Sequence, residues 1–80
     1  NETPLFLLEG VEILNIRPVG SEGKHIKFDG KAAGKMFEGI GFQFGPHEAA
    51  LQKATRLVVH LEKNEWMGKV SSQLRLVDFT

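Results

Sequence analysis

The feature that most constrains the fold is an alternation of apolar and polar side chains along most of the chain. Successive side chains of a β-strand point to opposite faces, so a period of two residues is typical of strands that bury one face. The pattern occurs in five segments, residues 11–19, 24–30, 37–45, 56–64 and 69–79. These segments predict an all-β fold, in which the first two strands form a hairpin through the turn sequence GSEG.

One segment, GPHEAALQKAT at residues 45–55, has a different period. Pro46 suits a first helical turn, and His47, Ala50, Leu51 and Ala54 share a face at helical spacing. A single short helix is therefore expected between strands 3 and 4. This order of elements is that of a five-stranded OB-fold barrel, in which closure hides the strand edges.

The size and composition of the chain limit its organisation. Eighty residues are enough for one domain. We expect an N-terminal linker segment at 1–10 and the OB-fold domain at 11–80, cut from a longer protein because the chain begins at Asn1. The absence of cysteine excludes disulfides and thiolate metal sites, and it suits a cytoplasmic location. No apolar run approaches the roughly 20 residues that a membrane helix needs.

The interior of the barrel is expected to hold the aromatic side chains of the second and third strands. These side chains alternate with polar residues or glycine, as inward-facing positions do. Glycines in the third strand permit sharp coiling of the sheet. The expected core residues are Phe28, Ile40, Phe42 and Phe44, and the glycines are Gly39 and Gly41.

The charge is zero overall but unevenly distributed. Residues 1–14 carry three acids and no base, whereas residues 15–36 carry five bases against two acids. Residues 37–80 carry five of each. A neutral chain does not bind nucleic acid through bulk electrostatics, and an anionic partner is expected to prefer residues 15–36.

The only tryptophan lies in the sequence NEWMGK, where a turn is expected between the fourth and fifth strands. Asn64 and Gly68 can adopt left-handed conformations, which predicts a hairpin with a bulge. Two roles for Trp66 remain open. Its ring can fold over the barrel rim, with the indole N–H bonded to a carbonyl, or it can stack on a nucleic-acid base.

Two longer strings carry a family resemblance. The stretches RPVGSEGKHIKF at 17–28 and NEWMGKVSSQLRLVDF at 64–79 resemble the C-terminal OB domain of bacterial RecJ exonucleases. The resemblance includes Pro4 and Phe6 near the start and the IGF sequence at 40–42, so it covers nearly the whole chain.

The resemblance implies a parent protein that degrades single-stranded DNA from its 5′ end in recombination and repair. In that family Mg²⁺ or Mn²⁺ acts in the catalytic region, with Asp and His ligands on upstream domains. The present chain has only Asp29 and Asp78, without a metal-ligand pattern, so no catalytic residue, metal or cofactor is expected in it. The implied role is a clamp that steers the strand toward the nuclease.

Single-stranded DNA needs cations for its phosphates and flat side chains for its bases. Each candidate for such a contact also has an alternative role that involves no DNA. Arg17 could form an ion pair with Glu22, and the remaining polar candidates could simply belong to the solvated faces of strands. The candidate DNA-binding residues are Arg17, Lys24, His25, Lys27, Trp66, Lys69, Gln73 and Arg75. His25, His47 and His60 fall on separate elements, which makes a zinc site improbable.

The expected partners are single-stranded DNA, the upstream nuclease domains of the same chain, and a repair or replication protein. A second function remains open, namely a structural or protein-interaction barrel that packs on the nuclease core or recruits a repair partner. The neutral charge favours this alternative. A free-standing regulatory barrel that binds RNA or a small ligand is a third class.

Overall fold

The structure is a computed structural model that describes residues 4–80, except for the side chains of Asn64, Trp66 and Ser71. It is mostly β with one short helix, as predicted, and it is consistent with an OB fold. The elements are β1 (Leu5–Glu9), β2 (Glu12–Val19), β3 (His25–Ala32), β4 (Lys35–Gly41), α1 (Glu48–Gln52), β5 (Arg56–Trp66) and β6 (Lys69–Phe79). Short 3₁₀ turns occupy Ser21–Gly23 and Gly45–His47.

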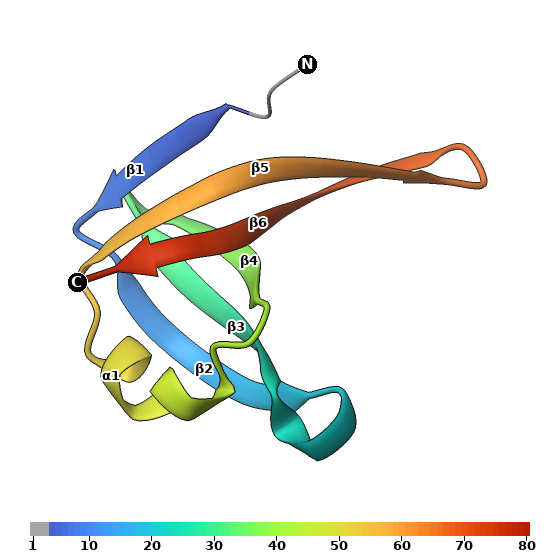
Figure 1. The fold of residues 1–80 in the computed structure, drawn as a ribbon. Coiled ribbons are helices and arrows are strands. Elements are labelled where there is room, and N and C mark those ends of the chain that lie inside the picture. The colour runs from blue at the N-terminus through green and yellow to red at the C-terminus, as the bar shows by residue number, and fades with distance from the viewer. Residues whose placement is uncertain (1–3) are drawn as a thin grey trace.

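All six strands belong to one sheet, in the order β1-β5-β6-β4-β3-β2 (Figure 1). Neighbouring strands are antiparallel except β4 and β6, which are parallel. The sequence predicts five strands, and the additional one is β1. It comes from the segment that was expected to be a linker, and it pairs with β5 over its whole length.

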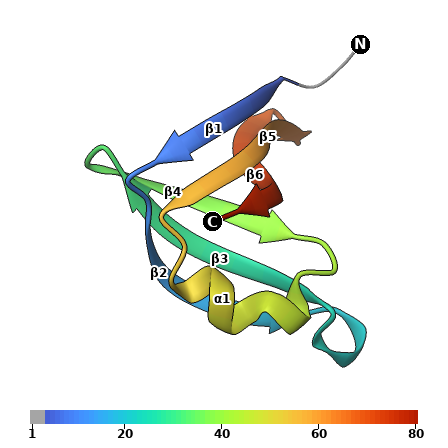
Figure 2. The same ribbon diagram turned by 60° about the vertical axis from the view of Figure 1, so that its left-hand side comes forward.

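The two edge strands of this sheet, β1 and β2, are consecutive in the chain. Gly10, with φ of 66°, turns the chain between them in a conformation that favours glycine. Val11 then donates a backbone hydrogen bond of 2.9 Å to the carbonyl of Thr55. The sheet curls so that its two edges approach each other at this corner (Figure 2).

The core is built around two reciprocal pairs of phenylalanine and glycine on β3 and β4. Phe28 lies opposite Gly39, and Gly30 lies opposite Phe37. The two rings meet edge to face, with centroids 6.4 Å apart. A Cβ atom on Gly39 would collide with the Phe28 ring. The other buried side chains are Val11, Ile13, Ile26, Leu51, Ala54, Leu57, Val59 and Leu76.

The prediction of core residues is correct for Phe28 and wrong for Ile40 and Phe42. Ile40 pairs with Lys27 on the outer face of the sheet, and Phe42 is 49% exposed. Two inner positions of β4, Gly39 and Gly41, are glycine because aromatic rings from other segments occupy the space beside them. Phe44, beyond the end of β4, packs against the core and lies close to Gly41.

The short helix closes one end of the curled sheet. Pro46 lies in the 3₁₀ turn before α1, and Leu51 and Ala54 are buried, as predicted. Gln52 donates a side-chain hydrogen bond of 3.1 Å to the carbonyl of Ile13 on β2. His47 and Ala50 are exposed, contrary to the prediction, since α1 has only five residues and buries a narrow strip.

Strands β5 and β6 form a long hairpin that extends beyond the rest of the sheet (Figure 1). The prediction of a loop with a bulge at the end of this hairpin is wrong. The ladder continues to the Trp66–Lys69 pair, and only Met67 and Gly68 form the turn, with φ of 50° and 81°. Positive φ at both central residues is the feature of a type I′ turn, whose twist matches that of the strands.

Candidate nucleic-acid interface

A row of residues crosses four neighbouring strands on the outer face of the sheet. Arg17 on β2 lies opposite Lys27 on β3, which lies opposite Ile40 on β4. Ile40 lies opposite Arg75 on β6, which lies opposite His60 on β5. Residues directly opposite each other share a face, so three of the predicted cations line up across the sheet. At strand spacing the distance from Arg17 to Arg75 is about 14 Å.

A second row, which lies two residues along each strand from the first, is acidic. Asn15, Asp29 and Glu38 lie opposite one another on β2, β3 and β4, and Glu62 lies opposite Gln73 on β5 and β6. A residue two positions away on a strand points to the same face. The acidic side chains therefore lie on the outer face, beside the cations.

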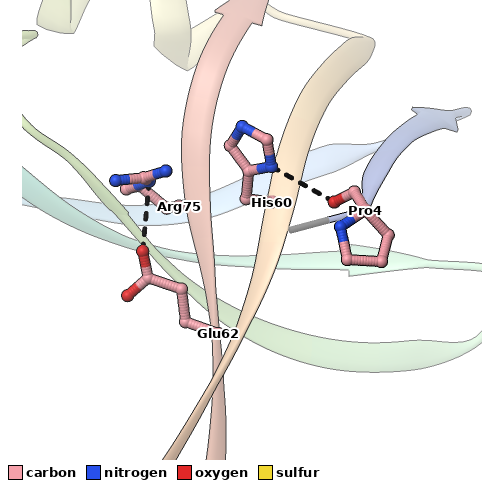
Figure 3. Close-up of polar contacts among 4 residues, drawn as sticks. All are labelled: Pro4, His60, Glu62 and Arg75. Atoms are coloured by element: carbon pink, nitrogen blue, oxygen red, sulfur yellow. Dashed lines mark hydrogen bonds and ion pairs between the residues drawn. The ribbon is translucent and has the colours of Figure 1, made fainter. Parts of the chain in front are cut away.

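Two of the three cations form ion pairs with this acidic row. Arg17 Nη1 lies 3.6 Å from Asp29 Oδ2, whereas the sequence suggested Glu22 as its partner. Arg75 Nε lies 3.1 Å from Glu62 Oε1, and His60 Nδ1 donates to the carbonyl of Pro4 at 3.2 Å (Figure 3). Both arginines are more than two-fifths exposed, so each pair contributes at most about 1 kcal/mol and can be exchanged for another anion.

Lys27 lies between the two arginines in this row and is half-buried. No ion pair of Lys27 is found among the residues that the structure describes. Its partner on β4 is Ile40, the apolar member of the row. Of the three cations in this row, Lys27 is therefore the one that no carboxylate of the described residues holds.

The β2–β3 connection places Lys24 and His25 at one end of the strands. Lys24 is exposed and its Nζ lies 3.8 Å from Glu22 Oε2. His25 Nδ1 accepts the backbone N–H of Gln43 at 2.8 Å, and its ring lies edge-on to Phe42 at 5.5 Å. One ring nitrogen of His25 thus holds the segment after β4 in place, which leaves Nε2 for a ligand.

The β5–β6 turn carries the other predicted residues. Lys69 is exposed at the start of β6, opposite Trp66 in the ladder. The side chain of Trp66 lies outside the described residues, so its two predicted roles are not distinguished. Gln73 and Arg75 share the outer face of β6, as predicted. In Figure 1 the β5–β6 turn lies at the upper right of the molecule and the β2–β3 connection at the lower right.

Sequence reasoning missed the partners of the cations. Alternation along residues 24–30 places Asp29 on the same face as Lys27, but the contact of Asp29 with Arg17 depends on the register of β2 against β3. The conformation of the connection between Val19 and His25 sets this register, because the pairs from Val19–His25 to Asn15–Asp29 run without a shift and the bulge between Ile13 and Asn15 lies beyond them. Glu62 and Arg75 meet for a similar reason, since the turn at Met67 and Gly68 fixes the register of β5 against β6 without a shift as far as the Val59–Leu76 pair.

Residues 4–80 also bear on two other kinds of feature, metal sites and membrane-spanning helices. Within this range no three His, Asp or Glu side chains are grouped so that they could hold a metal ion. The same residues include no helix of the length and apolarity that crossing a membrane requires.

Comparison with known proteins identifies the family. A search of curated proteins found no match. The family model described as the RecJ OB domain matches residues 1–78, almost the whole chain. The matched residues include the β2–β3 connection, the β5–β6 turn and the complete cationic row. The chain therefore belongs to the RecJ OB-domain family, a domain of the RecJ exonucleases of DNA repair and recombination.

Proposed function

We propose that this domain binds single-stranded DNA and steers it toward the nuclease domains of a RecJ-type 5′-to-3′ exonuclease. The observation that supports the proposal is the outer-face row of Arg17, Lys27 and Arg75, with Ile40 between them. In OB folds, oligonucleotides bind this region of the sheet and the two connections that flank it. We also propose that β1 and β2 are the two halves of the first strand of a closed barrel.

Each candidate residue has a role in this proposal. The cations of the row contact phosphates, as do Lys24 and Lys69 at the two connections, and Gln73 donates a hydrogen bond beside Arg75. His25 orients the end of β3 through Gln43 and offers Nε2 to the strand. Trp66 stacks on a base, a contact worth roughly 1–3 kcal/mol.

The catalytic step belongs to the parent protein in this proposal. Mg²⁺ or Mn²⁺ would act on separate, upstream domains, in a cytoplasmic enzyme. The segment before Gly10, which supplies β1, would also lead to those domains. The fragment itself would bind DNA without cleaving it.

Binding by the isolated domain should be weak because the acidic row competes with the phosphates. We expect a Kd of roughly 10⁻⁴ to 10⁻⁶ M, as in non-specific complexes. Fluorescence anisotropy with a labelled oligothymidylate measures it. Each phosphate contact contributes about −0.7 to the slope of log K against log salt, so high salt should abolish binding.

The variant K24A/K27A tests the assignment. Its salt slope should be smaller by about 1.4, which is two phosphate contacts, with a Kd several-fold higher. The control for the loss of each lysine is K53A, which removes one exposed lysine at the end of α1, away from the proposed interface. Binding that is absent, or that is insensitive to salt and to K24A/K27A, would favour the alternative function as a structural or protein-interaction barrel. Exposed Leu5 and Leu7 on β1 are the feature that suits this alternative.

A further inference from the structure

The sheet has an opening between β4 and β6. These strands pair only at Gly39–Leu74 and Ile40–Arg75. Before these positions β6 leaves β4 and continues with β5 into the projecting hairpin (Figure 1). In the described structure, Lys35–Glu38 and Lys69–Gln73 have no strand partner on the edges that face each other. Unpaired edges present rows of N–H and C=O groups that can accept another strand.

An open groove lies in this gap. Its volume is about 500 Å³. Phe37, Leu61 and Leu74 line it from the inner face of the sheet, and Met36, 64% exposed, lines it from the outer face. The groove therefore offers apolar contacts beside free backbone hydrogen-bonding groups, which is the combination that binds an extended peptide by strand addition.

The outer rim of the groove is acidic. Asp29 and Glu38 both line it and lie directly opposite each other on β3 and β4. Like charges in this arrangement repel. Asp29 pairs with Arg17, whereas no ion pair of Glu38 is found in the described part of the chain. A cation from outside would relieve the repulsion, and a phosphate would increase it.

We propose that an extended, basic segment of a partner protein adds to the sheet at this groove, against the free edge of β4 or β6. Alternate side chains of a strand point to opposite faces. Apolar residues of the segment would contact Phe37, Leu61 and Leu74, and the intervening Lys or Arg residues would lie beside Glu38. The expected ligand is thus a short peptide in which apolar and basic residues alternate.

A second copy of this chain is a poorer occupant. The exposed edge strand β1 is apolar, but its only charged residue is Glu9 and residues 1–14 contain no base. It would bring no cation to Asp29 and Glu38. The proposal does not depend on DNA binding, since the described lining of the groove includes Asp29 and Glu38 but none of Arg17, Lys27 and Arg75.

The test is an NMR titration of the ¹⁵N-labelled chain with the capped peptide VKVKVKV, with VEVEVEV as the comparison. We expect the largest amide shifts at 35–38 and 69–73, and weaker binding of the acidic peptide. E38K should weaken VKVKVKV binding about five-fold or more, because it replaces attraction by repulsion. The matched control E48K makes the same charge change on α1 and should bind as the wild type does.

Several results would overturn the proposal. One is the absence of shifts at millimolar VKVKVKV, or shifts confined to other strands. Another is equal affinity of the wild type and E38K, or of the two peptides. Shifts at the groove that depend on protein concentration would assign it to a second copy. Oligothymidylate shifting the same amides as strongly would assign it to DNA.

Discussion

At the scale of single residues, the outer face is a balance between cations and carboxylates. Arg17 is held by Asp29 and Arg75 by Glu62, and Lys27 lies between them in the row. Exposed pairs of this kind are weak, so a phosphate that approaches the row can replace a carboxylate. The carboxylates thus lower DNA affinity without blocking the interface.

This balance predicts the effect of D29N. The substitution frees Arg17 and removes one negative charge from the outer face, so the affinity for oligothymidylate should rise about three-fold or more at low salt. Fluorescence anisotropy measures the change. The control D78N makes the same charge change at the end of β6, where Asp78 accepts the backbone N–H of Phe79. An equal rise for both variants would mean that net charge, rather than Arg17, is responsible.

The sequence identified the polar side chains of this face but not their contacts. Alternation assigns Lys27 and Asp29 to one face because it depends only on the order of residues in one strand. The contact between Arg17 and Asp29 depends on how two strands are aligned, and the conformation of the connection between Val19 and His25 sets that alignment. Asp29 could therefore not be recognised as the partner of Arg17.

At the scale of elements, the β3–β4 hairpin is held by its phenylalanine and glycine pairs. The aromatic ring of Phe28 covers the backbone of β4 at Gly39, so a side chain at this position would overfill the core. The sequence predicted curvature from Gly39 and Gly41. The structure shows the cause more directly: these glycines make room for rings.

G39A should therefore lower the free energy of unfolding by about 2–3 kcal/mol, through overpacking against Phe28. Urea denaturation measures it. F28L provides the space that the new methyl group needs, so the double variant should lose at least about 1 kcal/mol less than the sum of the two single changes. Additive losses would show that the contact between Phe28 and Gly39 is not the cause.

The β5–β6 turn contains a residue that is poorly suited to it. Met67 is 86% exposed and has φ of 50°, in the left-handed region that Asn adopts more readily. M67N should raise the free energy of unfolding by about 0.5–1 kcal/mol, as measured in urea. M36N is the control, since exposed Met36 lies in a strand, where Asn is disfavoured. A gain from M36N as large as that from M67N would contradict this account of the turn.

At the scale of the whole molecule, the two edge strands of the sheet, β1 and β2, are consecutive in the chain and meet at Gly10. The sequence predicted the helix and five of the strands in their correct order, since these segments have clear periods. It missed β1 because LFLL is apolar on both faces and has no period of two. The partner of β1 is β5, about fifty residues away, and local patterns carry no information on such a pairing.

This architecture places Arg17, Lys27 and Arg75 in one row across the outer face of the sheet. The central claim is that single-stranded DNA binds along this row. An NMR titration of the ¹⁵N-labelled chain with oligothymidylate at low salt tests it most directly. We predict the largest amide shifts around Arg17, Lys27, Ile40 and Arg75, reversed by added salt. Shifts centred on α1 or the outer side of β1, or no shifts at all, would contradict the claim.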